Sequence, residues 1–207
     1  MNKKIIDEIF SRFQKLNPTP KIELDFTNNY TLFVAVVLSA QSTDKGVNKA
    51  TKELFKIVND PSQMLILGEE NLKTHIKSIG LYNSKARHII RSSEIMFSDY
   101  NNQLPETFDE LCKLPGVGRK TANVLISTLF GEEAIAVDTH VFRVSNRLKF
   151  CKTKTPEATE KELNKIIPKQ WKKYAHHWMV LHGRYICKAR TPLCEICPIN
   201  DLCNFKR

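Results

Sequence analysis

The chain has 207 residues, with 32 Lys and Arg against 22 Asp and Glu, so its formal net charge at pH 7 is +10. Hydrophobic residues make up 42% of the sequence, which excludes a disordered polyelectrolyte and suits one large domain or two small ones. The longest apolar run, Leu32–Leu38, is far shorter than the roughly 20 residues of a transmembrane helix. The charged N-terminal segment lacks the apolar stretch of a signal peptide. We therefore expect a basic, globular, cytoplasmic protein whose cysteines are reduced.

Most of the chain is predicted to be helical, because apolar residues recur at three- and four-residue spacing, most clearly in Lys3–Leu16. Leu32–Leu38 would suit a buried strand as well as a buried helix, but a lone strand has no partner, so a helix is predicted. Helix starts are expected at Thr107 or Pro105, at Asp138 and at Thr155. The other predicted helices are Lys45–Val58, Asn83–Phe97, Phe108–Leu114, Arg119–Phe130, Thr139–Phe150 and Pro156–Ile167. The fold class is all-α.

Basic residues gather at two places in the sequence. One group adjoins a pair of glycines and consists of Lys113, Arg119 and Lys120. The other lies toward the C-terminus and consists of Lys172, Lys173, Arg184, Lys188 and Arg190. A protein that neutralises phosphates releases condensed counterions, so such clusters favour nucleic-acid binding over a diffuse coat of solvated lysines.

The glycines belong to the segment Leu111–Ala122, which reads as a short helix, a tight turn and a longer helix. Gly116 and Gly118 allow a sharp turn and close approach by another molecule, and they leave the first amides of the second helix open to an anion. A plain helix–helix turn explains the glycines alone. The adjacent basic residues favour a turn that grips a phosphate backbone without reading sequence.

Two residues after this turn carry candidate chemistry. Lys120 lies at a helix start, where the helix dipole and partial burial would lower the pKa of its amine and make it a nucleophile. A surface lysine paired with phosphate is the alternative. Asp138 follows an apolar stretch and is expected to cap a helix. A capping carboxylate has a fixed direction, so it can also serve chemistry beside it.

Four of the six cysteines lie close together near the C-terminus, in the pattern C-x6-C-x2-C-x5-C. This density indicates a metal ion or cluster. Zinc also binds four thiolates, but structural zinc sites usually contain two close pairs, and here there is one. The four are Cys187, Cys194, Cys197 and Cys203. The isolated Cys112 and Cys151 are expected to be small buried hydrophobes without a function.

These motifs together resemble the helix–hairpin–helix DNA glycosylase superfamily and, within it, the bacterial endonuclease III family. The resemblance extends over nearly the whole chain. It rests on Leu38–Asp44, Ile79–Ala86, Leu114–Asn123, Val137–Val144, His182–Tyr185 and the four cysteines.

The resemblance implies two helical domains flanking a cleft, with Lys120 and Asp138 facing each other across it. Residues 22–132 would form a core domain with the helix–hairpin–helix, and residues 1–21 and 133–207 a discontinuous cluster domain. The cysteines would hold a [4Fe–4S] cluster in a structural role. The activity implied is that of a monomeric, nucleoid-associated enzyme of bacterial base excision repair, which acts on damaged pyrimidines and abasic sites in double-stranded DNA.

In that family the lysine attacks the sugar C1′, expels the oxidised base as a glycosylase, and forms a Schiff base that permits β-elimination as a lyase. Lys120 occupies this position, and Asp138 that of the catalytic carboxylate. Acting on a base in duplex DNA requires flipping it out. Gln41 and Leu81 would then fill the gap and wedge the stack, rather than being a polar helix end and a core leucine. The backbone at Gly116, Val117 and Gly118 and the side chains Lys188 and Arg190 would contact phosphates.

Three other functions fit less of the sequence. An adenine glycosylase of the same superfamily is disfavoured because Lys120 is present and the chain ends soon after the cysteines. A non-catalytic DNA-binding module with a zinc knot has no use for a nucleophilic Lys120. An iron–sulfur electron carrier fits the cysteines but neither the charge nor the hairpin.

Overall fold

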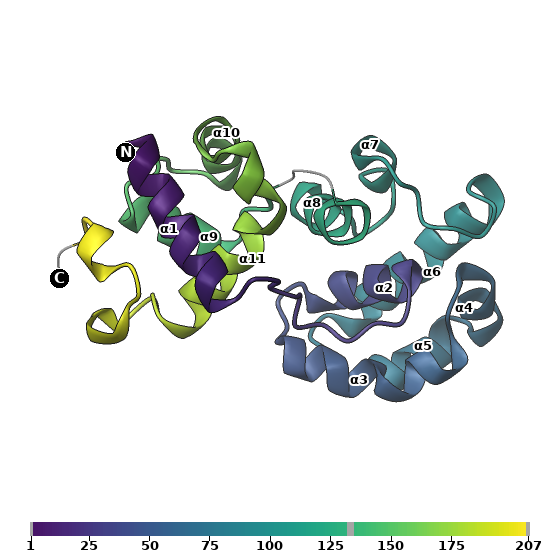
Figure 1. Ribbon diagram of the computed structural model, residues 1–207. Coiled ribbons are helices and arrows are strands. Elements are labelled where there is room, and N and C mark those ends of the chain that lie inside the picture. The colour runs from purple at the N-terminus through teal and green to yellow at the C-terminus, as the bar shows by residue number, and fades with distance from the viewer. Residues whose placement is uncertain (1, 132–134, 206–207) are drawn as a thin grey trace. The chain divides into compact units, whose positions relative to one another are not determined.

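The computed structural model describes residues 2–131 and 135–205, and every regular element in these ranges is a helix (Figure 1). The all-α prediction is confirmed. The chain forms two compact units. We call residues 23–130 the central domain and residues 1–22 with 131–207 the end domain, because the latter contains both chain ends. No helix in the described ranges has the length and apolarity needed to span a membrane.

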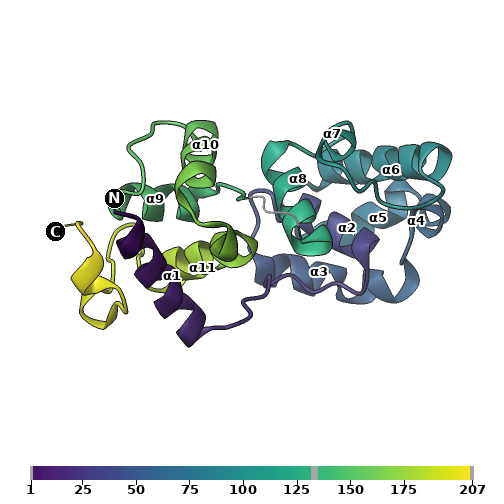
Figure 2. The same ribbon diagram turned by 45° about the horizontal axis from the view of Figure 1, so that its top comes forward.

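The central domain is built around one helix that is apolar on every side. This helix, α2 (Asn29–Ser39), is buried from Tyr30 to Leu38. A helix hydrophobic all round must lie inside a protein, and α2 packs against α3 (Asp44–Ile57), α6 (Tyr82–Asp99) and α8 (Arg119–Leu125). Figures 1 and 2 show α2 between α3 and α8. The helix predicted at Leu32–Leu38 is therefore confirmed, and its uniform apolarity reflects its central position.

The remaining central elements are short. They are α4 (Pro61–Leu67), α5 (Glu69–Ile76), α7 (Phe108–Leu111) and a π-helical turn, Ile126–Phe130, that continues α8. Both α4 and α5 pack on α6. Helices α4 and α5 were not expected from the sequence, because each is only two turns long and shows too few periods to detect.

The end domain joins the N-terminal helix to segments more than 120 residues away. Its helices are α1 (Lys3–Leu16), α9 (Thr139–Arg147), α10 (Pro156–Ile166) and α11 (Lys169–Tyr185), followed by 3₁₀ turns at Cys194–Ile196 and Asn200–Leu202. The Phe10 ring is fully buried among the rings of Phe13, Phe150, Trp171 and Trp178, with centroids 6.0–6.3 Å away. This shared core holds the two parts of the domain together without a linker of distinctive composition.

Helix caps follow the predicted residues. The Asp138 side chain caps α9, and Thr155 caps α10 with Pro156 in the first turn. Thr107, rather than Pro105, caps α7. Helix α11 was not predicted, although Trp171, Ala175, Trp178, Met179 and His182 recur at helical spacing.

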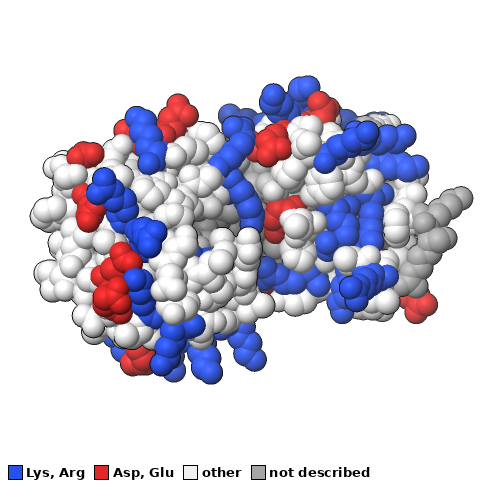
Figure 3. All heavy atoms as spheres, turned by 180° about the vertical axis from the view of Figure 1, so that it is seen from behind, with Lys and Arg blue, Asp and Glu red and all other residues white. Residues whose placement is uncertain are grey.

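The net positive charge comes from one domain. The end domain carries 20 Lys and Arg against 10 Asp and Glu, a net +10, whereas the central domain carries 12 of each and is neutral. On the face drawn in Figure 3, basic side chains predominate over the end domain and mix with acidic ones over the central domain. Long-range attraction to a polyanion would thus come chiefly from the end domain.

The C-terminal basic group of the sequence is not one cluster. Lys173 lies near the start of α11 and Arg184 at its end, and eleven residues of helix separate them by about 16 Å. Adjacency in sequence therefore overstated their proximity. Lys188 and Arg190, by contrast, are both exposed in the loop that follows Cys187.

Candidate functional site

The glycine turn between α7 and α8 is held from beneath by α6. Gly116 has φ +81°, and a Cβ there would lie 3.0 Å from the Cβ of His88. The Ser92 hydroxyl donates a hydrogen bond of 2.9 Å to the carbonyl of Pro115. Only glycine meets both demands at position 116, because the backbone is left-handed and the helix beneath leaves no space.

Gly118 differs from Gly116 in kind. Its φ is −91°, which any residue adopts, and a Cβ there would meet no atom within 4 Å. It is the N-cap residue of α8 and has no side chain to accept a capping hydrogen bond from the first amides of that helix. The glycine therefore leaves open surface beside the N-terminal end of α8, an arrangement suited to an approaching anion.

Val117 has an internal role. Its side chain is buried, and its N–H donates to the carbonyl of Leu114 at 3.0 Å. Val117 therefore anchors the turn through its side chain, and the phosphate contacts predicted for the backbone at Gly116, Val117 and Gly118 stay a prediction.

Lys120 lies in the first turn of α8, and its side chain is exposed. The partial burial expected from the sequence is therefore absent. The amine is two residues from the open surface at Gly118, close to where a bound phosphate would lie.

Asp138 is held rigidly at the start of α9. Its Oδ1 accepts a hydrogen bond of 2.7 Å from the N–H of Val141, and the preceding Ile135–Val137 is buried. The Nδ1 atom of His176 lies 2.7 Å from the carbonyl oxygen of Ala136, fixing this segment further. The capping role is confirmed. Asp138 belongs to the end domain and Lys120 to the central domain, so their juxtaposition stays a prediction.

Gln41 and Leu81 are brought together within the central domain. Both have left-handed backbones, with φ of 56° and 60°, which cost a non-glycine residue about 1–3 kcal/mol. Both side chains are exposed, Leu81 to 62%. A Cβ on Gly80 would lie 3.9 Å from the Gln41 carbonyl oxygen, so the two loops touch. Leu81 is therefore not a core leucine, and strain at two exposed, adjacent residues is typical of functional sites.

The four clustered cysteines line one cavity in the end domain, together with Leu148, Ile186 and Ile199. Burial, and then the neighbouring cysteines, raise the pKa values of the Cys197 and Cys203 thiols. Four thiolates there would need a strongly cationic centre to neutralise them. Among the described residues no three His, Cys, Asp or Glu side chains converge to hold a single ion. Four cysteines that line one cavity can hold a centre with four thiolate ligands, which an iron–sulfur cluster requires.

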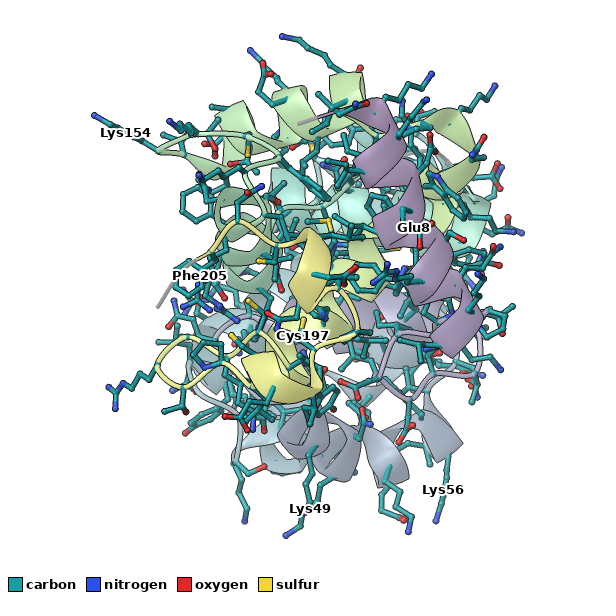
Figure 4. All side chains as sticks on the ribbon, turned by 60° about the vertical axis from the view of Figure 1, so that its left-hand side comes forward. Glu8, Lys49, Lys56, Lys154, Cys197 and Phe205 are labelled. Carbon is teal, nitrogen blue, oxygen red and sulfur yellow. The ribbon has the colours of Figure 1, made fainter. Side chains whose placement is uncertain are left out.

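Two arginines of α9 shape the cysteine loop and were missed in the sequence. Arg147 donates to the carbonyls of Lys188 and Ala189, both at 2.7 Å, and to the Cys187 Sγ at 3.3 Å, while its guanidinium stacks over the Phe205 ring. Arg143 donates to the Cys187 carbonyl at 3.1 Å. Their four-residue spacing on the helix of Asp138 was the available signal. Figure 4 shows Cys197 within the C-terminal turns and Phe205 beyond them.

Helix α1 supports the same segment from the other side. Arg12 forms a bidentate ion pair with Asp201, with distances of 2.6 and 2.9 Å, and bonds to Glu8 at 2.8 Å. Figure 4 places Glu8 on the helix neighbouring the C-terminal turns.

Of the isolated cysteines, Cys151 is buried as expected, whereas Cys112 is exposed, so the expectation was wrong for Cys112.

Two family models match the chain. The model described as "HhH-GPD superfamily base excision DNA repair protein" matches residues 34–169. The model described as "Iron-sulfur binding domain of endonuclease III" matches residues 187–203, which include all four clustered cysteines.

Curated relatives match over the full length. The endonuclease III of Rickettsia conorii (strain ATCC VR-613 / Malish 7) is 56% identical over 205 residues, covering 99% of this chain and 98% of the relative. The endonuclease III of Escherichia coli (strain K12) is 51% identical over 206 residues, covering 100% and 98%.

Solved structures agree. A trapped endonuclease III–DNA covalent intermediate, an estranged-adenine complex, has a TM-score of 0.91 and 47% identity, covering 99% of this chain and 96% of that one. A thermostable thymine-DNA glycosylase, at 22% identity and a TM-score of 0.84, shares the fold. The similarity thus includes both the glycine turn and the cysteine loop.

Proposed function

The chain belongs to the HhH-GPD superfamily of base excision DNA repair proteins, in its endonuclease III family, and we propose that it both excises oxidised pyrimidines from duplex DNA and cuts the strand at the resulting abasic site. Glycosylase activity follows from the family. The lyase step rests on one observation, an exposed Lys120 beside the open amides of the glycine turn.

In the proposed chemistry the Lys120 amine is the nucleophile. Its nitrogen attacks the sugar C1′, and the electron pair of the glycosidic bond leaves with the base. Ring opening gives an iminium ion, which makes a C2′ proton acidic. Loss of that proton expels the phosphate at C3′ and breaks the strand, and water then releases the sugar from Lys120.

Asp138 would serve as the carboxylate partner. One of its oxygens is fixed by the Val141 N–H, so the direction of its negative charge is set before substrate binds. A preorganised carboxylate stabilises the cationic sugar at the transition state and accepts or returns protons. This role requires Asp138 to face Lys120 when DNA is bound.

The proposed partner is double-stranded DNA carrying damaged pyrimidines or abasic sites, bound by one copy of the chain in the bacterial cytoplasm at the nucleoid. The similar endonuclease III structures include both a covalent and a non-covalent complex with DNA. A target base must leave the helical stack before Lys120 can reach its sugar. In this chain, Leu81 and Gln41 would fill the space that the flipped base leaves.

A [4Fe–4S] cluster is the cofactor, and Cys187, Cys194, Cys197 and Cys203 would hold it. When bound, it supplies a covalent cross-link among the C-terminal turns. Arg143 and Arg147 already hold the Cys187 end of the loop, which presents Lys188 and Arg190 to solvent. Those two side chains would then contact backbone phosphates.

The direct test is borohydride trapping. The purified protein is mixed with duplex containing a single oxidised pyrimidine, and with a duplex containing an abasic site. Cleavage together with a covalent protein–DNA adduct is expected on both. If neither substrate is cleaved or trapped, the chain is better described as a non-catalytic DNA-binding module.

Replacing each of the two glycines of the turn by alanine should affect a different property: folding stability at Gly116 and duplex binding at Gly118. Gly116→Ala should lower the free energy of unfolding by about 1–3 kcal/mol, because of its positive φ and the contact with His88. Gly118→Ala should change stability by only a few tenths of a kcal/mol. It should weaken duplex binding roughly tenfold, because a methyl group would then lie where a phosphate approaches the amides. Thermal unfolding and fluorescence-anisotropy titration measure the two effects. Full duplex affinity in Gly118→Ala would contradict the phosphate site.

Arg190→Ala should lower affinity for all undamaged duplex sequences together and make the slope of log K against log salt shallower by about 1. A phosphate contact carries charge but no base information. Lys154→Ala is the control, since Figure 4 shows Lys154 projecting away from Cys197. It removes the same charge outside the loop and should change the slope less. A change in sequence preference at constant slope would contradict the role given to Arg190.

A further inference from the structure

Lys85 is a buried lysine in the first turns of α6. Only 5% of it is exposed, and its amine donates three hydrogen bonds to the loop around Gln41. The acceptors are the carbonyls of Leu38 at 2.8 Å and Ala40 at 2.6 Å and the hydroxyl of Ser42 at 3.1 Å. The amine therefore holds the backbone of the loop on both sides of Gln41.

All three acceptors are neutral, and two of them are carbonyls at the C-terminal end of α2, which ends at Ser39. Such carbonyls lack partners within their own helix and carry partial negative charge. Burial lowers the pKa of the Lys85 amine. The opposing attraction of the helix end favours the ammonium form, which has a hydrogen for each acceptor.

The same residue is tied to the second loop. The backbone N–H of Lys85 donates to the carbonyl of Leu81 at 3.0 Å, and Gly80 contacts the Gln41 carbonyl. Leu81 is the left-handed N-cap residue of α6. Lys85 thus links two loops that are far apart in sequence, each with one exposed, non-glycine residue at positive φ.

Lys85 also belongs to a wider stripe on α6. Leu81, Lys85, His88 and Ser92 recur at four-, three- and four-residue spacing and so share one face of the helix. His88 and Ser92 support the glycine turn, the first by lying against Gly116 and the second by its bond to Pro115. One face of α6 therefore sets the positions of the Gln41 loop, Leu81 and the turn.

We propose that Lys85 is a positioning residue that locks the Gln41 and Leu81 loops into one preformed unit, so that both side chains enter the duplex together at a damaged pair. This inference rests on the proposed function and adds to it the group that prepares the two loops. Lys85 touches neither DNA nor the reacting atoms. It acts by holding two strained backbones in place before DNA arrives.

The first test needs no DNA. In Lys85→Met the side chain keeps its length and loses its donors. Amide hydrogen exchange in peptides covering residues 39–43 and 79–85 should accelerate on the order of tenfold in both loops. Lys52→Met, which removes the same charge from an exposed position of α3, should leave both loops unchanged. Acceleration in the Gln41 loop alone would overturn the coupling of the two loops.

The second test separates base flipping from chemistry. Lys85→Met should trap single-stranded abasic DNA within about twofold of the wild-type yield, because Lys120 is untouched and no base needs to be displaced. On duplex with a paired oxidised pyrimidine the yield should fall on the order of tenfold. The fluorescence rise of 2-aminopurine placed opposite the lesion, which reports unstacking, should fall in parallel. Equal losses on the two substrates would overturn the proposal, since a general structural defect predicts that result.

If Lys85→Met does not fold, Ser42→Ala carries the test, because it removes one acceptor and leaves the amine and both carbonyls. It should lower the ratio of duplex to single-strand trapping in the same direction, and an unchanged ratio would overturn the proposal. Failure of the wild-type protein to trap any substrate would instead contradict the proposed lyase function. The exchange experiment would still decide whether Lys85 couples the loops.

Discussion

Lys120→Gln is expected to abolish both strand cleavage and borohydride trapping on duplex that carries an oxidised pyrimidine. Imine formation requires an amine, and an amide nitrogen cannot supply one. Binding should remain within a few-fold of wild type, because the open amides above Gly118 do not depend on the Lys120 side chain. Single-turnover cleavage, adduct yield and anisotropy measured on the same duplex separate these effects.

Lys113→Gln is the matched control for this experiment. It removes the same charge from another exposed lysine of the same helix–hairpin–helix segment, and cleavage and trapping should persist. Two results would argue against the assignment. Cleavage by Lys120→Gln at the wild-type rate would place the nucleophile elsewhere. Equal losses of cleavage and trapping in both variants would mean that Lys120 contributes only its positive charge.

Local sequence signals predicted most of the secondary structure because they act over a few residues. Lys3–Leu16 was predicted with its observed bounds, and the caps at Asp138 and Thr155 lie where short polar side chains precede an apolar pattern. Arg119–Phe130 was predicted as one helix but changes to π geometry at Ile126. The apolar pattern of the segment carries no signal for that change of hydrogen bonding.

The candidate site likewise contains residues that the sequence reveals and residues that it does not. The glycine turn, Lys120 and the four cysteines each form a compact motif that is visible along the chain. The residues that support them were invisible because their partners are distant in sequence. Lys85 meets Leu38 and Ala40 about 45 residues away, and Arg147 meets the cysteine loop about 41 residues away. A buried lysine and an exposed one look alike until those partners are known.

The net charge of the chain indicated the kind of partner but not which domain attracts it. The net charge of +10 indicated a polyanion partner, but the sequence did not show that the central domain, which holds the glycine turn, is neutral. Long-range attraction to DNA would thus come from the end domain. Close contact at the turn would depend on backbone amides, which a count of charged residues does not register.

Cys197→Ser should lose the cluster and release the C-terminal turns. Cys197 is the second cysteine of the close pair and lies in the shared cavity, where an alkoxide is a far poorer iron ligand than a thiolate. A cluster site does not exist in the unfolded chain, so binding free energy contributes to folding, and its loss should lower the melting temperature. Anaerobically purified wild-type protein should contain about four iron and four sulfide per chain, and the variant well below half of that.

Loss of the cluster should reach DNA binding through the loop between Cys187 and Cys194. Arg147 would still hold Lys188 and Ala189, but the far end of the loop would have lost its anchor, so affinity for undamaged duplex should fall several-fold and the salt slope should become shallower, as in Arg190→Ala. Cys112→Ser, at an exposed cysteine outside the cavity, should keep iron, stability and affinity. Stoichiometric zinc without sulfide in the wild-type protein would contradict the cluster, and full iron content in Cys197→Ser would contradict the ligand.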